Sequence, residues 1–390
     1  MSHFNQTFNR KNTASLKWDL MEKVYTIPDA SSIIPMWVAD MDFAAPSFIT
    51  ESLKARLDFP LFGYTFENEA CATAVTSWVK RRHNWHIHND DIMYHQGVVP
   101  AIATIIEAFT TEDDAVIVNS PVYPPFFNIP RQLGRTVVSS PFIEKKGRLY
   151  FDFDHFERLL QDDKVKIFVF CHPHNPAGRV WSQDELVKID ALCAANNVLI
   201  ISDEIHCDLM LNGEQHIPLA KVSATPDNII TCMAPTKTFN IAGIQASMMI
   251  TSDAKKRLKI QNTLAKHGQM GLNTFAITAV QAAFSDAGIE WLNDLIPYLN
   301  ANLDYAIDTI EKALPNITIT KPDATYLMWI DIRKTGIAEK EIMQKLLDAG
   351  VALDPGTKYG ADFDGFLRMN IACTRQTLEQ GVERFIKAFN

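Results

Sequence analysis

VKIFVFCHPHNPAG, residues 165–178, joins an apolar run to a polar turn. The first seven of these residues are rich in Val, Ile and Phe, a composition typical of a strand that is buried on both faces. Similar runs occupy residues 115–119, 198–202 and 229–233. Helical periodicity lies between them, as in residues 183–196, where apolar side chains recur three and four apart. Strands and helices that alternate at this spacing predict a parallel sheet of βαβ units.

The chain on either side of this block has a different pattern. The block itself runs from about residue 46 to 285, and the first 45 residues look irregular. Beyond it, we predict a long helix at residues 289–314. We also predict strands at 326–332 and 366–371 and helices at 340–349 and 377–388. We therefore predict an α/β protein of three parts: residues 1–45 as an N-terminal arm and part of a small domain, 46–285 as a large domain, and 286–390 as a small C-terminal α+β domain.

Composition excludes several classes of protein. The 390 residues are 47% hydrophobic and 21% charged, as in globular domains, and the formal net charge of −9 disfavours a nucleic-acid partner. No apolar run approaches the roughly 18–20 residues of a membrane span, and the N-terminus lacks the apolar core of a signal peptide. The six cysteines form no C-x-x-C pair, which favours free buried thiols in a reducing, cytoplasmic setting. We expect His83, His86 and His88 to be solvated surface, and we expect no metal site.

Three polar side chains follow three of the predicted strands. Asn175 follows residues 165–171, Asp203 follows 198–202, and Lys237 follows 229–233. The carboxyl ends of parallel strands meet at one edge of a sheet, where open α/β sheets bind ligands. The sequence therefore predicts a site that contains all three side chains.

These residues and their neighbours carry a family resemblance. The order Asn-Pro-x-Gly, Asp-x-x-His and Thr-Lys resembles the fold-type I pyridoxal-phosphate enzymes of the aminotransferase class I/II group. The chain is similar, more narrowly, to the MalY/PatB-type cystathionine β-lyases, or C–S lyases. The stretches that carry this resemblance cover nearly the whole chain: residues 17–19, 35–43, 63–65, 97–102, 121–126, 202–206, 237–243 and 368–370.

The resemblance implies a fold, a cofactor and an assembly. The fold would be that of PLP transferases of type I, in which a mainly parallel seven-stranded sheet lies between helices in the large domain. Lys237 would form the Schiff base with pyridoxal 5′-phosphate, and Asp203 would pair with the pyridine nitrogen and keep it protonated. Tyr64 would reach the phosphate of the neighbouring subunit, which implies a homodimer with shared active sites.

Further residues would complete the cofactor site. A helix that starts at Pro100 would offer the phosphate its N-terminal N–H groups. The side-chain amide of Asn175 would donate to the phenolic oxygen of the cofactor. The Asn175-Pro176 peptide bond is a candidate cis bond. His206 either binds the same phenolic oxygen or packs nearby. Gly97, Val98 and Val99 are predicted to contact the phosphate, and Thr236 is predicted to add a hydroxyl group there. Tyr123 is predicted to stack on the cofactor ring.

The substrate side is simpler, and the chain departs from its relatives at two positions. Arg368 suits an α-carboxylate, because a guanidinium fork binds it through two parallel hydrogen bonds. Trp37 would line the substrate cleft, where Asn175 also lies. Gln245 stands where many relatives place a phosphate-binding arginine, and Ala234 stands where they often carry serine.

The predicted activity is α,β-elimination on cystathionine or a related cysteine S-conjugate, giving a thiol such as homocysteine, pyruvate and ammonia. An aminotransferase is the alternative, because it needs the same residues and no residue of this chain forces one fate. A regulatory binding protein on the same fold is the second alternative. The intact set of Lys237, Asp203, Asn175 and Arg368 argues against a purely non-catalytic role.

Overall fold

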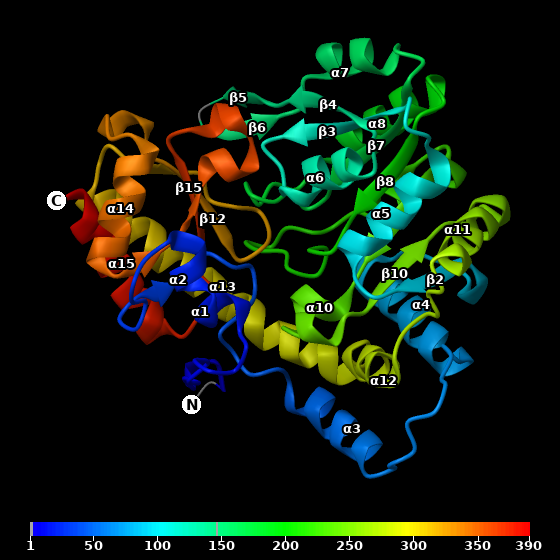
Figure 1. Ribbon diagram of the computed structural model, residues 1–390, viewed down its shortest axis with the longest axis horizontal. Helices are drawn as coiled ribbons and strands as arrows, with labels where there is room; N and C mark the ends of the chain where they lie inside the picture. The colour runs from blue at the N-terminus through cyan, green and yellow to red at the C-terminus, as the bar shows by residue number, and fades with distance from the viewer. Residues whose placement is uncertain (1–2, 146) are drawn as a thin grey trace.

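A seven-stranded sheet forms the middle of the molecule (Figure 1). The computed structural model describes residues 3–145 and 147–390. The strand order is β2-β10-β9-β8-β7-β3-β4, and only β10 runs antiparallel to its neighbours. The strands are β2 (Ile92–His95), β3 (Ala115–Ser120), β4 (Thr136–Pro141), β7 (Val165–Cys171), β8 (Leu199–Asp203), β9 (Ile229–Met233) and β10 (Ser247–Ile250). The predicted fold class, a mainly parallel seven-stranded sheet between helices, is confirmed.

Both faces of this sheet are covered, which explains the continuous apolar runs. In β7, Ile167 and Val169 belong to one buried cluster, and Phe168 and Phe170 belong to another. This alternation is what the two-residue period of a strand requires when both of its faces are packed. Helices of the first cluster are α5 (Val98–Phe109), α6 (Pro125–Gln132) and α11 (Ala254–Lys266), and helices of the second are α7 (Phe153–Leu160), α8 (Gln183–Ala195) and α9 (Leu219–Val222).

A smaller unit gathers both ends of the chain, as Figure 1 shows by the blue N-terminal helices beside the orange and red ones. Its antiparallel sheet has the order β11-β12-β15-β14, and β1 adds the N-terminal segment by pairing in parallel with β13. The long helix α13 (Asp286–Ala313) leads into this unit. Its other elements are α1 (Leu16–Asp19), α2 (Met21–Tyr25), β1 (Ile34–Pro35), β11 (Thr318–Ile319), β12 (Leu327–Asp331), α14 (Glu339–Ala349), β13 (Val351–Ala352), β14 (Asp354–Pro355), β15 (Phe366–Asn370) and α15 (Arg375–Phe389). The exact boundaries after residues 45 and 285 stay predictions.

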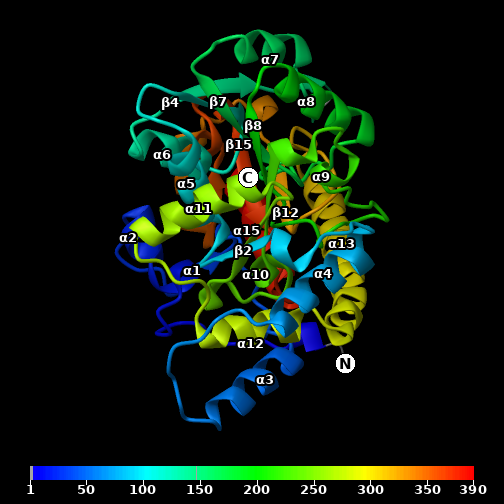
Figure 2. The same ribbon diagram turned by 90° about the vertical axis from the view of Figure 1, so that its right-hand side faces the viewer.

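Helix α3 (Ser47–Leu57) and the loop after it project from the body in both views (Figures 1 and 2). The chain then returns through α4 (Glu69–His83), against which α12 (Thr274–Ala283) packs. The end of α3 and the loop after it carry apolar side chains that are more than half exposed, namely those of Leu57, Phe59, Leu61, Phe62, Tyr64 and Phe66. An apolar surface of this extent marks an interaction site rather than an ordinary loop.

The structure corrects several sequence predictions in detail. Strand β8 includes Asp203, because that residue pairs with both neighbouring strands. Helix α5 begins at Val98 rather than Pro100, and the first 45 residues contain two short helices and a strand. The candidate cis bond between Asn175 and Pro176 is confirmed. Across the described ranges, no helix is both long and apolar enough to traverse a bilayer.

Candidate active site

The register of three parallel strands brings the predicted catalytic residues together. Cys171 on β7 is level with Asp203 on β8, which is level with Cys232 on β9. Asn175 lies four residues after Cys171, and Lys237 lies five residues after Cys232. All of these chain segments therefore leave the sheet at one edge, as predicted for a parallel sheet.

A cavity of about 610 Å³ opens at this edge, between the sheet and the smaller unit. That size falls within the range of small-molecule sites. Most of the predicted site residues line it: Trp37, Gly97, Val98, Val99, Tyr123, Asn175, Asp203, His206, Lys237 and Arg368.

Lys237 lies on the one-turn helix α10 (Pro235–Thr238), directly after β9. Its Nζ donates to the carbonyl oxygen of Ala39 at 2.5 Å. Burial and the neighbouring Arg368 together lower the pKa of Lys237 to about 8, against the opposing effect of Asp40 and Asp203. An amine with such a pKa is a nucleophile and a proton acceptor near neutral pH.

Asp203 is a buried carboxyl group with few partners. Burial raises the pKa of Asp203 to about 7, and Glu204 raises that pKa too, while a hydrogen bond from the backbone N–H of Ile205 and the charge of Lys237 lower it. The carboxyl group lines the cavity. The carboxyl group is therefore placed to pair with a cationic group of a ligand. The positive charge of that group would favour the ionised form of Asp203.

Asn175 and His206 supply two further polar groups. Asn175 Oδ1 accepts a hydrogen bond of 3.1 Å from Arg368 Nη1, which leaves the amide nitrogen as the side chain's remaining donor. Burial lowers the pKa of His206 to about 3, so the imidazole is neutral. Its Nδ1 is buried without a hydrogen-bond partner among the described residues.

Arg368 lies on β15 and is held from three sides. Its Nη2 donates to the carbonyl oxygen of Trp37 at 2.6 Å and to Asp354 Oδ2 at 2.8 Å, and Asp354 is level with it on β14. Only 3% of Arg368 is exposed. Its Nε is buried without a hydrogen-bond partner within the described part of the chain, and Arg368 lines the cavity.

The start of α5 also lines the cavity. Gly97 precedes this helix with a φ of 132°, a conformation that residues with a Cβ rarely adopt, and no side chain among the described residues caps the helix. The first N–H groups of a helix have no partner within it, and with the helix dipole they attract an anion. Gln245 also lines the cavity and carries a neutral amide.

The segment of residues 36–43 closes the site from the N-terminal side. The Ala39 carbonyl oxygen, which accepts from Lys237, also accepts from the hydroxyl of Tyr326 at 3.0 Å. Asn370 Nδ2 binds the carbonyl oxygens of Val38 and Asp40, each at 2.6 Å. The position of this segment therefore determines where the Lys237 amine rests.

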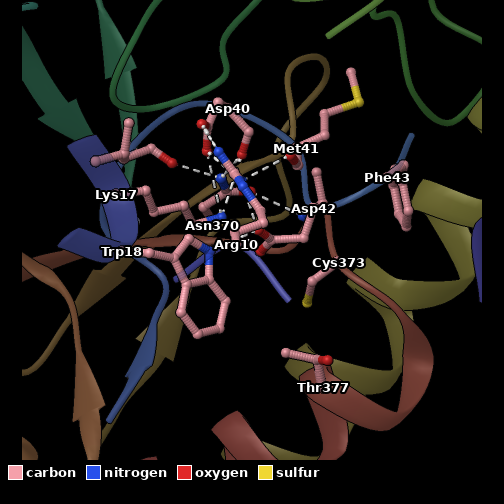
Figure 3. A network of polar contacts seen from close by, with 12 residues as sticks. Arg10, Lys17, Trp18, Asp40, Met41, Asp42, Phe43, Asn370, Cys373 and Thr377 are labelled. Atoms are coloured by element: carbon pink, nitrogen blue, oxygen red, sulfur yellow. Dashed lines mark hydrogen bonds and ion pairs between the residues drawn. The ribbon is translucent and has the colours of Figure 1, made fainter. Parts of the chain in front are cut away.

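A cluster of charges ties the same segment to the N-terminal arm (Figure 3). Arg10 pairs with Asp40 at 2.6 Å and with Asp42 at 2.7 Å, and Lys17 pairs with Asp42 at 2.7 Å. The indole of Trp18 also donates to Asp42. Lys17 is only 1% exposed, so its charge depends on these carboxylates.

Replacing Lys17 with methionine is expected to lower the free energy of unfolding by about 3 kcal/mol, because it leaves a buried carboxylate short of a partner. Urea unfolding of the purified variant measures the change. Lys23→Met, at an exposed lysine of α2, is the matched control and is expected to change stability by less than about 0.5 kcal/mol. Equal losses in the two variants would show that the cluster adds no stability of its own.

Two predicted site residues lie outside the cavity. Thr236 is buried beside Lys237 but does not line the cavity, so the prediction that it adds a hydroxyl there is not supported. Tyr64 is 98% exposed on the projecting loop. It can take part in a site only if another molecule approaches that loop.

Sequence patterns did not indicate several residues of the site. Asp354, Lys358 and Tyr359 line the cavity from the smaller unit, and Gln96 and Asn128 line it from the larger one. Asp354 is an acidic residue within the apolar run 351–355, and this unusual position was the one available signal for it. Its pairing with Arg368 depends on the β14–β15 register, which sequence spacing does not reveal.

The prediction that all three histidines near residue 85 are solvated is wrong for His83. His86 and His88 are exposed, but His83 is buried, with Nε2 3.2 Å from Asp208 Oδ1. Ligand atoms of His83, Cys207 and Asp208 lie within 4.8 Å of one another. Asp208 already accepts from the indole of Trp78 and the hydroxyl of Thr238, so this cluster joins α4 to α10 rather than offering free ligands.

The chain is similar to known proteins over almost its full length. The model of the family "Aminotransferase class I and II" matches residues 45–385. Cystathionine beta-lyase PatB of Bacillus subtilis is 44% identical over 99% of both chains, and Protein MalY of Escherichia coli is 30% identical over 100% of this chain and 99% of its own.

A solved structure agrees with these matches. Cystalysin from Treponema denticola, which contains a pyridoxal 5′-phosphate cofactor, superposes with a TM-score of 0.95 at 35% identity, over 99% of this chain and 98% of its own. Fold, site geometry and sequence similarity thus agree, and the chain belongs to the aminotransferase class I and II family.

Proposed function

We propose that this protein is a pyridoxal-phosphate-dependent C–S β-lyase that performs α,β-elimination on cystathionine or related cysteine S-conjugates. The observation that carries the proposal is the single cavity shared by Lys237, Asp203 and Arg368 at the strand ends. The relatives support it, because PatB is named a cystathionine β-lyase and is 44% identical. Pyridoxal 5′-phosphate is the cofactor.

The residues present fit this cofactor. The uncapped start of α5 suits the phosphate, and Asp203, which has one hydrogen bond from the backbone, suits a protonated ring nitrogen. Lys237 has the lowered pKa that attack on an aldehyde requires. Asn175 and His206 are the candidates for the phenolic oxygen, and Tyr123 is the candidate for ring stacking.

When bound, the cofactor supplies an electron sink for the charge that remains at the substrate Cα. Arg368 holds the α-carboxylate of the substrate, and Lys237 takes the proton from Cα. Asp203 would hold its negative charge toward the ring nitrogen and so favour the protonated form of that nitrogen. The Cβ–S bond then breaks and the thiolate leaves. With the uptake of one water molecule, the remainder ends as pyruvate and ammonia.

Thiol release tests this proposal. Purified protein loaded with cofactor is expected to release thiol from cystathionine, and removal of the cofactor is expected to abolish the release. Homoserine, which has no sulfur leaving group, serves as the control for unspecific thiol signal. If cofactor-loaded protein releases no thiol from cystathionine or from S-methylcysteine, the lyase proposal fails.

The assembly is a second part of the proposal: a homodimer in which each active site receives Tyr64 from the other subunit. The support is the apolar loop that contains Phe59, Leu61 and Phe62, which is exposed in the single chain. A C2 dimer would bury this loop. The basic residues that line the cavity, Lys237, Lys358 and Arg368, lie on elements other than α5, whose start is the proposed phosphate site. A partner's hydroxyl at the phosphate would add a donor there.

Tyr64→Phe is expected to weaken cofactor binding about tenfold, because it removes one hydrogen bond to a charged group. Fluorescence titration of the apoprotein with pyridoxal 5′-phosphate measures this, and sedimentation tests the dimer. Tyr150→Phe, at another exposed tyrosine, is the control. A monomer with the same cofactor affinity in all three proteins would rule out the shared site.

We propose the cytoplasm as the location of this protein. All six cysteines are buried and free, which suits a reducing compartment.

A further inference from the structure

Lys358 lies at the rim of the cavity, on the short helical turn Gly356–Tyr359 of the smaller unit. Its side chain is 41% exposed, whereas those of Arg368 and Asp354 are 4% and 3% exposed. Its Nζ lies 2.7 Å from Asp354 Oδ1 and 5.5 Å from the centre of a Trp37 ring. Besides the Lys237 amine, the cavity thus has a buried guanidinium in its interior and an ammonium group at its mouth.

These two cations share one carboxylate. Asp354 Oδ1 binds Lys358, while Asp354 Oδ2 binds Arg368 at 2.8 Å and accepts from the hydroxyl of Tyr359 at 2.8 Å. One negative charge cannot neutralise two positive ones, so this end of the cavity keeps a surplus of positive charge. Asp354 would still have Arg368 and Tyr359 as partners if Lys358 moved away.

The two cations differ in what they can bind. Arg368 is buried and held by Asn175, Trp37 and Asp354, so it is a fixed receptor for one carboxylate. Lys358 has a flexible stem and a compact charge in contact with solvent, so it can follow a second anionic group. The apolar side chains of Leu16 and Trp37 line the cavity too and suit the methylene groups that separate two such charges.

We propose that Lys358 determines specificity for S-conjugates whose leaving thiol carries a carboxylate. This inference rests on the proposed lyase function and adds the chemical class of the leaving group. The sheet closes the inner end of the cavity, so the leaving group extends toward the mouth, where Lys358 would bind its carboxylate in place of, or beside, Asp354.

Two substrates of nearly equal size separate the effect of charge from that of shape. S-(2-carboxyethyl)cysteine ends its leaving thiol in a carboxylate, and S-(3-methylbutyl)cysteine ends it in an uncharged isopropyl group with the same number of heavy atoms. The quantity measured is the ratio of their kcat/KM values for thiol release. Lys358→Met is expected to lower this ratio about fivefold, a modest factor because the lysine is half-exposed, and Lys358→Arg is expected to restore it.

Lys345→Met is the matched control. Lys345 is 44% exposed and pairs with Glu341 four residues earlier on α14, outside the cavity, so its loss is expected to leave the ratio unchanged. High salt gives a measurement without a variant: it is expected to lower the ratio in the wild type and to have little effect on it in Lys358→Met.

The outcomes distinguish the two proposals. Equal loss of activity toward both substrates in Lys358→Met, or no change in the ratio, would overturn the specificity role while the lyase function stands. Absence of thiol release from either substrate by the wild type would refute the lyase function, and the inference with it.

Discussion

Lys237→Ala is expected to lower thiol release from cystathionine by at least about 10³-fold, because it removes both the covalent anchor of the cofactor and the proton acceptor for Cα. The amine is buried in the cavity, and the pKa of Lys237 is lowered to about 8, so the neutral form is far more available than in an exposed lysine. No other lysine is available there to replace it: of the described lining residues, Lys358 alone is also a lysine, and it lies at the mouth.

The measurement combines turnover with the visible absorbance of the cofactor bound to lysine. The variant is expected to lose both, and added methylamine is expected to restore part of the turnover by acting as a free base. Lys266→Ala, at an exposed lysine of α11, is the control and should match the wild type. A Lys237→Ala protein that kept a tenth of its activity would exclude Lys237 from the chemistry.

Asp203→Asn is expected to have opposite effects on activity and on the stability of the apoprotein. Turnover should fall about 10²–10³-fold, because the variant loses the negative charge that keeps the ring nitrogen protonated. Apoprotein stability should rise by about 2–4 kcal/mol at pH 8, because the variant no longer buries an ionised carboxyl group that has few partners.

The gain in apoprotein stability expected for Asp203→Asn depends on pH. The folded apoprotein holds the Asp203 proton up to a pKa of about 7, whereas the unfolded chain loses it near pH 4. The wild type therefore loses stability as pH rises between these values, and the full cost is present above pH 7. The gain from Asp203→Asn should be largest at pH 8 and should vanish near pH 4.

Urea unfolding of the two apoproteins across this pH range measures the gain. Asp208→Asn is the matched control, because this buried carboxylate accepts from Trp78 and Thr238. Burial alone would raise the pKa of Asp208, but the neighbouring His83 and Arg82 and the Trp78 indole lower it. Its loss is expected to destabilise the protein. If Asp203→Asn also destabilised the apoprotein at pH 8, Asp203 would be a structural residue rather than one kept for the cofactor.

The centre of the site could be predicted because its geometry is that of parallel strands. Once residues 165–171, 198–202 and 229–233 are recognised as neighbouring strands, their common direction places Asn175, Asp203 and Lys237 at one edge. The buried apolar runs on both faces of the sheet made these strands visible in the sequence. Local pattern and tertiary structure agree in this part of the chain.

The remainder depends on contacts between distant residues. The pairing of His83 with Asp208 joins residues 125 positions apart, and a histidine at the end of a polar helix gave no sign of it. Asp354 meets Arg368 through an antiparallel register in the smaller sheet. Thr236 is buried on the same turn of helix as Lys237, and its role at the cofactor stays a prediction.

The division of products between two fates tests the central claim most directly. Cofactor-loaded protein is given cystathionine together with 2-oxoglutarate, and pyruvate, homocysteine and glutamate are measured in the same sample. A C–S β-lyase is expected to form pyruvate and homocysteine in equal amounts, at a rate that 2-oxoglutarate does not change. Glutamate formed in proportion to the cystathionine consumed, without pyruvate, would contradict the account and identify an aminotransferase.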